Sequence, residues 1–251
     1  MDLTGCGMNI EKTEKIVHLY AEHLEWGKVK EIWHDERLGD RGSRHSSQKV
    51  FHILKKRLLS GNDTLPSIKH LSEILEVCEG KRDKAQVLYF YILEKEGLVR
   101  FLINRLSQKV NDEQKIDFRN EKLAELLEDF RFTDEEQLPY SEATLKRWFA
   151  GFRGVMREIG VIPSRQDLEG EPPLIGNVPL QVASGYSWKK MEKNWLEKPI
   201  GWIDLFQPKE NWKDLSSQLS QYDNCELYEV QGKQRMKPKE NPFKVGEIDG
   251  D

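Results

Sequence analysis

Residues 141–162 read SEATLKRWFAGFRGVMREIGVI and predict one long helix with two different faces. At 100° per residue, the apolar side chains gather on one side of this helix, namely Leu145, Trp148, Phe149, Phe152, Val155, Met156 and Ile159. The opposite side carries Lys146, Arg147, Arg153 and Arg157, with only Ala150, Gly151 and Gly154 between them. Small residues among cations let a helix approach an anion closely, which is typical of a helix that contacts DNA. An ordinary surface helix with a basic outer face has the same pattern.

The composition indicates a helical protein with a large charged surface. The chain has 251 residues, of which 33% are charged and 37% are apolar, so it can bury a core without disulfides. No apolar run approaches the roughly 20 residues that a membrane helix needs, and the N-terminus lacks an apolar signal-peptide core. The cysteines Cys6, Cys78 and Cys225 are far apart and form no CxxC pair. We therefore expect reduced thiols and a cytoplasmic location, with no membrane partner.

The charges are segregated along the chain although the net charge is only −4. Residues 1–165 carry 28 Lys and Arg against 28 Asp and Glu, and residues 166–251 carry 11 against 15. Within the balanced part, Arg41–Arg57 holds six cations and no carboxylate, whereas Glu121–Glu142 holds eight carboxylates and two cations. Because the local field steers a polyanion, the negative net charge does not exclude DNA as a partner.

Hydrophobic periodicity predicts consecutive helices through the first 160 residues. The expected helices are Glu11–Glu25, a second from Val29 to near Gly39, a third capped by Ser46 or Ser47, a fourth from Pro66 to Gly80, then Ala85–Leu93, Leu98–Val110 and Lys115–Phe130. Ala85–Leu93 is apolar nearly all round, so we expect it to be the central helix of the bundle. Ser141 and Thr144 predict a cap for the helix quoted above.

Beyond Ile162 prolines and glycines replace the helical pattern. Short runs such as Pro173–Ile175 and Val178–Val182 suggest a β-wing, Lys209–Gln221 one more short helix, and Cys225–Val230 a strand. The predicted fold class is therefore mainly α, a multi-helix bundle with a small Pro-rich α+β C-terminal extension. We assign residues 1–110 to an N-terminal helical bundle, 201–236 to the small extension and 237–251 to a disordered tail.

Enzymatic signatures are missing. The sequence contains no GxxxxGK[ST], GxGxxG, HExxH or GxSxG motif. The six histidines lack metal-ligand spacing, since His18 and His23 point about 140° apart around a helix. We expect no catalytic residues, no metal site and no cofactor, and we predict that the chain is not an enzyme.

The segment RGSRHSSQKVFHILKKRLL, which begins at Arg41, is the second basic signal. Arg41, Arg44 and Lys49 cluster where a turn leads into a helix start, and backbone N–H groups and hydroxyls there suit a phosphate. Lys55, Lys56 and Arg57 lie near the helix C-terminus, where cations also stabilise the helix dipole. The turn is therefore the stronger candidate for phosphate contact.

Three blocks together resemble the BrxA family of BREX bacteriophage-exclusion systems. They are DERLGDRGSRHSSQKVFHILKKRLL, KAQVLYFYILEKEGLVRFLINRL and SEATLKRWFAGFRGVMREIGVI, and the resemblance covers about residues 8–165. It implies an all-helical protein with helix-turn-helix or winged-helix character, which we place in residues 111–200. It further implies that the protein binds double-stranded DNA and has no catalytic activity. The other BREX proteins, which are methyltransferase, phosphatase-like and ATPase components, would then be its partners. The segment after Ile162 is longer than the family pattern.

The matching positions are Arg41, Arg44, Lys49, Lys146 and Arg147, and the exposed stripe of the late helix adds Arg153 and Arg157. The hypothesis is a non-enzymatic DNA-binding component of a BREX-type system. The late helix would approach the major groove and the turn would hold the adjacent backbone, mainly through phosphate contacts. The alternative is a protein-interaction adaptor that assembles a larger defence complex without binding DNA. A nuclease would need a carboxylate and lysine cluster that the sequence does not show.

Overall fold

The computed structural model is mainly α-helical and describes residues 3, 7–39, 43–61, 63–111, 115–130, 140–230 and 233–246. The longer helices are α2 (Ile10–His23), α3 (Trp26–Asp35), α4 (Arg44–Leu59), α5 (Ile68–Val77), α6 (Lys81–Lys95), α7 (Gly97–Lys109), α8 (Asn120–Leu127), α9 (Glu142–Glu158), α10 (Asn177–Met191) and α12 (Trp212–Leu219). Shorter helical segments are η1 (Glu192–Glu197), α11 (Ile200–Asp204) and η2 (Lys209–Asn211). The predicted fold class is confirmed, including the small α+β part at the C-terminal end.

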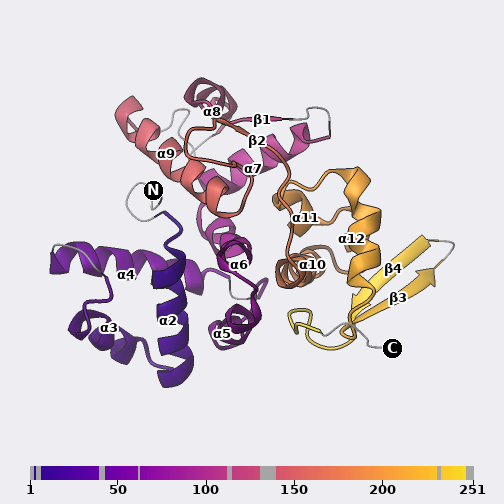
Figure 1. Ribbon diagram of the computed structural model, residues 1–251, viewed down its shortest axis with the longest axis horizontal. Coiled ribbons are helices and arrows are strands. Elements are labelled where there is room, and N and C mark those ends of the chain that lie inside the picture. The colour runs from indigo at the N-terminus through magenta and orange to yellow at the C-terminus, as the bar shows by residue number, and fades with distance from the viewer. Residues whose placement is uncertain are drawn as a thin grey trace.

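Helix α6 lies at the centre of the molecule, as predicted. It contacts α2, α4, α7, α9 and α10, and every residue from Ala85 to Leu93 is buried. In Figure 1, α2–α5 lie on one side of α6, α7–α9 above it, and α10–α12 with the C-terminal hairpin on the other side. A helix that is apolar all round fits only where neighbours cover every face, which explains the sequence of α6.

The helix starts follow capping chemistry, with one difference from the prediction. The hydroxyl of Ser141 accepts from the N–H of Thr144, which confirms the expected cap of α9. Helix α4 begins earlier than expected, because the hydroxyl of Ser43, rather than Ser46 or Ser47, accepts from the N–H of Ser46. Ser47 is instead buried and accepts a hydrogen bond from Nε1 of Trp33 at 2.9 Å.

The run Val178–Val182, which we expected outside helical structure, lies in α10. Pro179 is tolerated there because the N–H groups of a first helical turn have no intrahelical partner. Every residue from Val178 to Ser187 is buried, so the helix has no polar stripe and shows no helical period. Gly185 allows close packing, since a Cβ there would lie 2.2 Å from the carbonyl oxygen of Pro242.

Two small antiparallel sheets complete the fold. Strand β1 (Ile116–Asp117) precedes α8 and pairs with β2 (Glu169–Gly170), which follows α9. Strand β3 (Cys225–Val230) is the predicted strand, and it pairs with β4 (Lys233–Pro238). The expected helix Lys209–Gln221 is present as η2 and α12.

The residues after β4 differ from the expected disordered tail as far as the structure describes them. Phe243 is buried, and the N–H of Gly246 donates to the Gln181 side chain at 2.7 Å. These contacts seat residues 239–246 on α10, because Gln181 and Gly185 belong to that helix. Residues 247–251 lie outside the described residues.

Candidate nucleic-acid interface

Contacts from three elements hold the described residues on either side of the connection to α4, which are Gly39 and the first turn of the helix. Lys12 of α2 donates to the carbonyl oxygen of Gly39 at 2.6 Å. Trp33 of α3 donates to Ser47, and a Cβ at Gly39 would lie only 2.0 Å from the Ser47 hydroxyl. These contacts fix Gly39 and the beginning of α4 relative to α2 and α3. Arg41 itself lies outside the described residues.

Helix α4 presents an exposed basic stripe. Arg44 and Lys49, both predicted to contact phosphate, are exposed. His45, Gln48 and His52 are exposed beside them, while Lys55 is half-buried with its ammonium 4.9 Å from the ring centre of Trp26. No Asp or Glu occurs in α4. Over three turns of helix, the stripe therefore contains cations and uncharged hydrogen-bonding side chains but no carboxylate.

A hollow on the surface joins this stripe to α3. It is lined by Lys30, His45, Gln48, Lys49, Phe51, His52 and Lys55. Three of these residues are lysines and none is a carboxylate, so the positive potential inside the hollow has no counter-charge among its lining residues. Partial burial, followed by Arg44 and Lys30, holds the pKa of His34 on α3 below its usual value, against a weaker opposite effect of Asp35. Lysines without a carboxylate among the lining residues are the feature of the hollow that would favour an anion.

Arg57, at the end of the same basic segment, is structural. Its side chain is buried, Nη1 donates to the carbonyl oxygen of Gly7, and Nη2 lies 3.6 Å from Oε1 of Glu96. A guanidinium enclosed in this way offers no surface to a phosphate. Lys56, its neighbour, is exposed.

The apolar face of α9 anchors the helix as predicted. Trp148 and Phe152 are fully buried and stack with ring centres 5.5 Å apart, and Phe152 packs against Phe118. The end of α9 is held by Gln86 of α6, whose amide donates to the carbonyl oxygen of Ile159 at 3.0 Å. The opposite face is thereby fixed toward solvent.

The four predicted cations of α9 have different surroundings. Lys146 and Arg147 are exposed, and Lys146 pairs with Glu142 one turn earlier at 2.7 Å. Arg153 is partly buried, and its Nη1 donates to the carbonyl oxygen of Phe118 and, at 2.8 Å, to Oδ1 of Asn120. Burial and the neighbouring Arg157 lower the pKa of Arg153. Lys146 and Arg147 are thus the cations that face solvent most freely.

Arg157 is half-buried and lies one turn from Gly154 on the same side of α9. A Cβ at Gly154 would have only Arg157 Nη2 within contact, at 3.9 Å, so this glycine leaves open space. Gly151 differs, because a Cβ there would lie 2.6 Å from the carbonyl oxygen of Leu3. The close approach that Gly151 permits is therefore to the N-terminal segment of the same chain.

Two described residues near the start of the chain contact the two basic helices. Leu3 packs on Gly151 of α9, and the carbonyl oxygen of Gly7 accepts from Arg57 of α4. Helices α4 and α9 both pack on α6, so the α4 stripe and the α9 cations belong to one continuous body.

The region predicted to be helix-turn-helix or winged-helix-like, residues 111–200, begins with β1, α8, α9 and β2, and α7 precedes it. Helix α8 packs against α7 and α9, and β1 pairs with β2 beyond α9. The connection from Leu127 to Glu142 is longer than the three or four residues of a helix-turn-helix turn. Residues 131–139 of this connection lie outside the described residues.

Sequence reasoning missed Lys30, Gln48 and His52 as members of the candidate surface. Lys30 is on a different helix, so only tertiary packing brings it to α4. The sequence could have indicated Gln48 and His52, because at 100° per residue they fall on the same side of α4 as Arg44. The absence of any carboxylate between Arg41 and Asn62 was the signal that marked this stripe.

The thiols and the acidic side chains that the structure describes do not suggest a second kind of site. Among the described residues, no group of three His, Cys, Asp or Glu side chains is arranged to hold a metal ion. Cys78 and Cys225 are free thiols, and burial raises the pKa of Cys78 to about 12. In the described part of the chain, no helix combines the length and the apolar character needed to cross a membrane.

Comparisons with known proteins bear on the fold alone. No family model matches the chain, and no curated protein does. Among solved structures, the chain is similar to an uncharacterized protein from Magnetospirillum magneticum, with a TM-score of 0.59 and 14% sequence identity. The match covers 81% of this chain and 97% of that chain, so the arrangement of helices described above also occurs in another protein.

Proposed function

We propose that the chain is a non-enzymatic double-stranded DNA-binding component of a BREX-type phage-defence system, acting in the cytoplasm. The observation that carries the DNA-binding part is the hollow between α3 and α4, which lysines and histidines line without a carboxylate. The exposed Lys146 and Arg147 of α9 supply a second group of cations. The BREX part rests on the resemblance of the three sequence blocks to the BrxA family.

Phosphate contacts dominate the proposed binding. Each cation that neutralises a phosphate releases counterions, so affinity falls steeply as salt rises. The order of elements around α9 supports a winged-helix-like docking, in which a helix and an adjacent small sheet approach the same duplex. Arg153 and Arg157 lie on the same side of α9 and add positive charge to that surface. Arg153 also donates a hydrogen bond to Asn120 of α8.

The test is a salt titration of binding to a duplex, with matched charge variants. Lys30, Arg44 and Lys49 are replaced together by alanine, and the control replaces Lys189, Lys213 and Lys239, which are exposed in α10, α12 and after β4. Both variants lose three positive charges. We expect the first to bind more weakly, with a slope of log K against log salt shallower by about 0.9 for each phosphate that is no longer neutralised. The control keeps the wild-type slope.

Equal slopes in the two folded variants would show that net charge, rather than this surface, governs binding. Absence of duplex binding near physiological salt, together with a stable complex with a methyltransferase, phosphatase-like or ATPase protein encoded nearby, would instead support the adaptor. Loss of phage exclusion in cells that carry the Lys30, Arg44 and Lys49 variant tests the defence role.

A further inference from the structure

The stripe of α4 has cations at its margins and other hydrogen-bonding groups along its middle. At 100° per residue, Arg44 and Lys55 lie within about 20° of each other at one margin, and Lys49 lies about 140° away at the other. Between them fall the amide of Gln48 and the imidazoles of His52 and His45. A helix in the major groove faces base edges and is flanked by the phosphates of the two strands. The α4 stripe has the matching order, with cations at its two margins and uncharged hydrogen-bonding groups between them.

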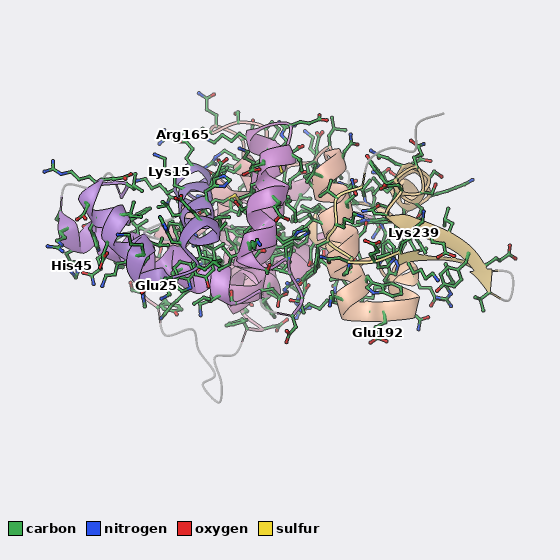
Figure 2. All side chains as sticks on the ribbon, turned by 90° about the horizontal axis from the view of Figure 1, so that it is seen from below. Lys15, Glu25, His45, Arg165, Glu192 and Lys239 are labelled. Carbon is green, nitrogen blue, oxygen red and sulfur yellow. The ribbon has the colours of Figure 1, made fainter. Side chains whose placement is uncertain are left out.

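The position of α4 leaves this stripe accessible. His45 lies at one end of the long axis of the molecule in Figure 2, opposite Lys239 toward the other end. Helix α3 packs against α4, where Trp33 and Phe51 lie with ring centres 5.7 Å apart. The N-terminal turns of α4 therefore project from the body, and these are the turns that recognition helices use.

The corresponding surface of α9 carries arginines and a lysine but no amide or imidazole side chain. Between its cations lie Ala150 and Gly154, which carry no hydrogen-bonding side chain. Its cation Lys146 is paired with Glu142, and Arg153 is hydrogen-bonded to the start of α8. The hydrogen-bonding groups on this side of α9 are all cations, which can contact phosphates or guanine, whereas α4 also offers an amide and two imidazoles in one row.

We propose that α4 is the helix that reads base edges in the major groove, with Gln48 as its central specificity residue and His45 and His52 beside it. Arg44, Lys49 and Lys55 hold the phosphates on either side. A glutamine amide can donate to N7 and accept from the N6 amino group of adenine at once, a pairing that discriminates among bases. This inference rests on the proposed function and reverses the expected roles of the two basic helices.

The experiment selects a preferred duplex from a pool with randomised base pairs, then measures affinity for that duplex and for a scrambled one. Gln48→Ala is compared with the wild type, and Gln221→Ala, an exposed glutamine beyond α12, is the matched control. We expect Gln48→Ala to lower the ratio of the two affinities about fivefold or more. Its salt slope stays unchanged, since an uncharged amide neutralises no phosphate. His45→Ala and His52→Ala relax preference at neighbouring base pairs.

The possible results separate this inference from the proposed function. The base-reading role of α4 is overturned if the wild type binds every duplex equally, or if Gln48→Ala keeps the wild-type ratio of affinities. Neither result contradicts the proposed binding to DNA. Failure of the wild type to bind any duplex overturns both. Gln48 is exposed and has no packing role, so the thermal unfolding of Gln48→Ala is expected to match that of the wild type.

Discussion

The carboxyl group of Asp204 shows how desolvation and charge pairing compete at a single residue. The side chain is buried in α11, and Arg100 Nη1 donates to its Oδ2 at 2.5 Å. Its other oxygen, Oδ1, is buried without a hydrogen-bond partner among the described residues. Burial raises the pKa of Asp204 to about 6, because the loss of hydration outweighs the attraction of Arg100. The native state therefore holds a proton on Asp204 more tightly than the unfolded chain does.

This shift predicts a pH dependence of stability. The contribution of Asp204 is fully present below its unfolded pKa near 4 and is lost as pH rises through about 6. Relative to Asp204→Asn, the wild type should lose up to about 3 kcal/mol in free energy of unfolding between pH 4 and pH 7. Denaturant unfolding of both proteins across this range measures the difference. A constant difference at every pH would mean that the pKa of Asp204 is the same in the native and unfolded states.

Single cations in the two basic segments differ in ways that sequence spacing does not reveal. Arg57 follows Lys55 and Lys56 directly, yet it is buried against Gly7 and Glu96 while Lys56 faces solvent. Arg153 lies on the predicted stripe of α9 and still bonds to Asn120 of α8. Because these partners come from distant parts of the chain, only the fold separates structural cations from those that face solvent.

Among the elements, helices with one apolar face were the ones that the sequence predicted well. The stripe of α9 and its Ser141 cap are where the pattern placed them, because solvent on one side leaves a helical period. Helix α10 has no solvent-facing side between Val178 and Ser187, so its sequence shows no helical period, and the prediction of a β-wing there was wrong. Strand β1 is two residues long and depends on pairing with β2, which lies more than 50 residues later.

The different surroundings of Gly151 and Gly154 in α9 predict opposite effects of alanine on stability. Gly151→Ala places a Cβ 2.6 Å from the Leu3 carbonyl oxygen, so it should displace the N-terminal segment and destabilise the protein by about 1–3 kcal/mol. Gly154→Ala has open space and should be neutral or stabilising by up to about 1 kcal/mol, since alanine favours helix. Thermal unfolding compares them. Equal stability of the two variants would mean that Leu3 does not pack on α9.

At the scale of the molecule, α6 supports both basic surfaces. Helices α4 and α9 each pack on it, while Leu3 packs on α9 and the carbonyl oxygen of Gly7 accepts from Arg57 of α4. The sequence predicted the central helix from its apolar residues, and it predicted Arg44 and Lys49 as surface cations. It did not predict the hollow, because Lys30 joins α4 only through the packing of α3 on that helix.

The most direct test of the account is whether both surfaces neutralise phosphates of one duplex. Arg44 and Lys49 are replaced by alanine in one variant, Lys146 and Arg147 in a second, and all four in a third, while Arg153 is kept because it braces α8. The slope of log K against log salt is measured for each. We expect each pair to make the slope shallower, by about 0.9 for every phosphate left without its cation, and the two effects to add in the third variant. Wild-type slopes in all three folded variants would contradict the account.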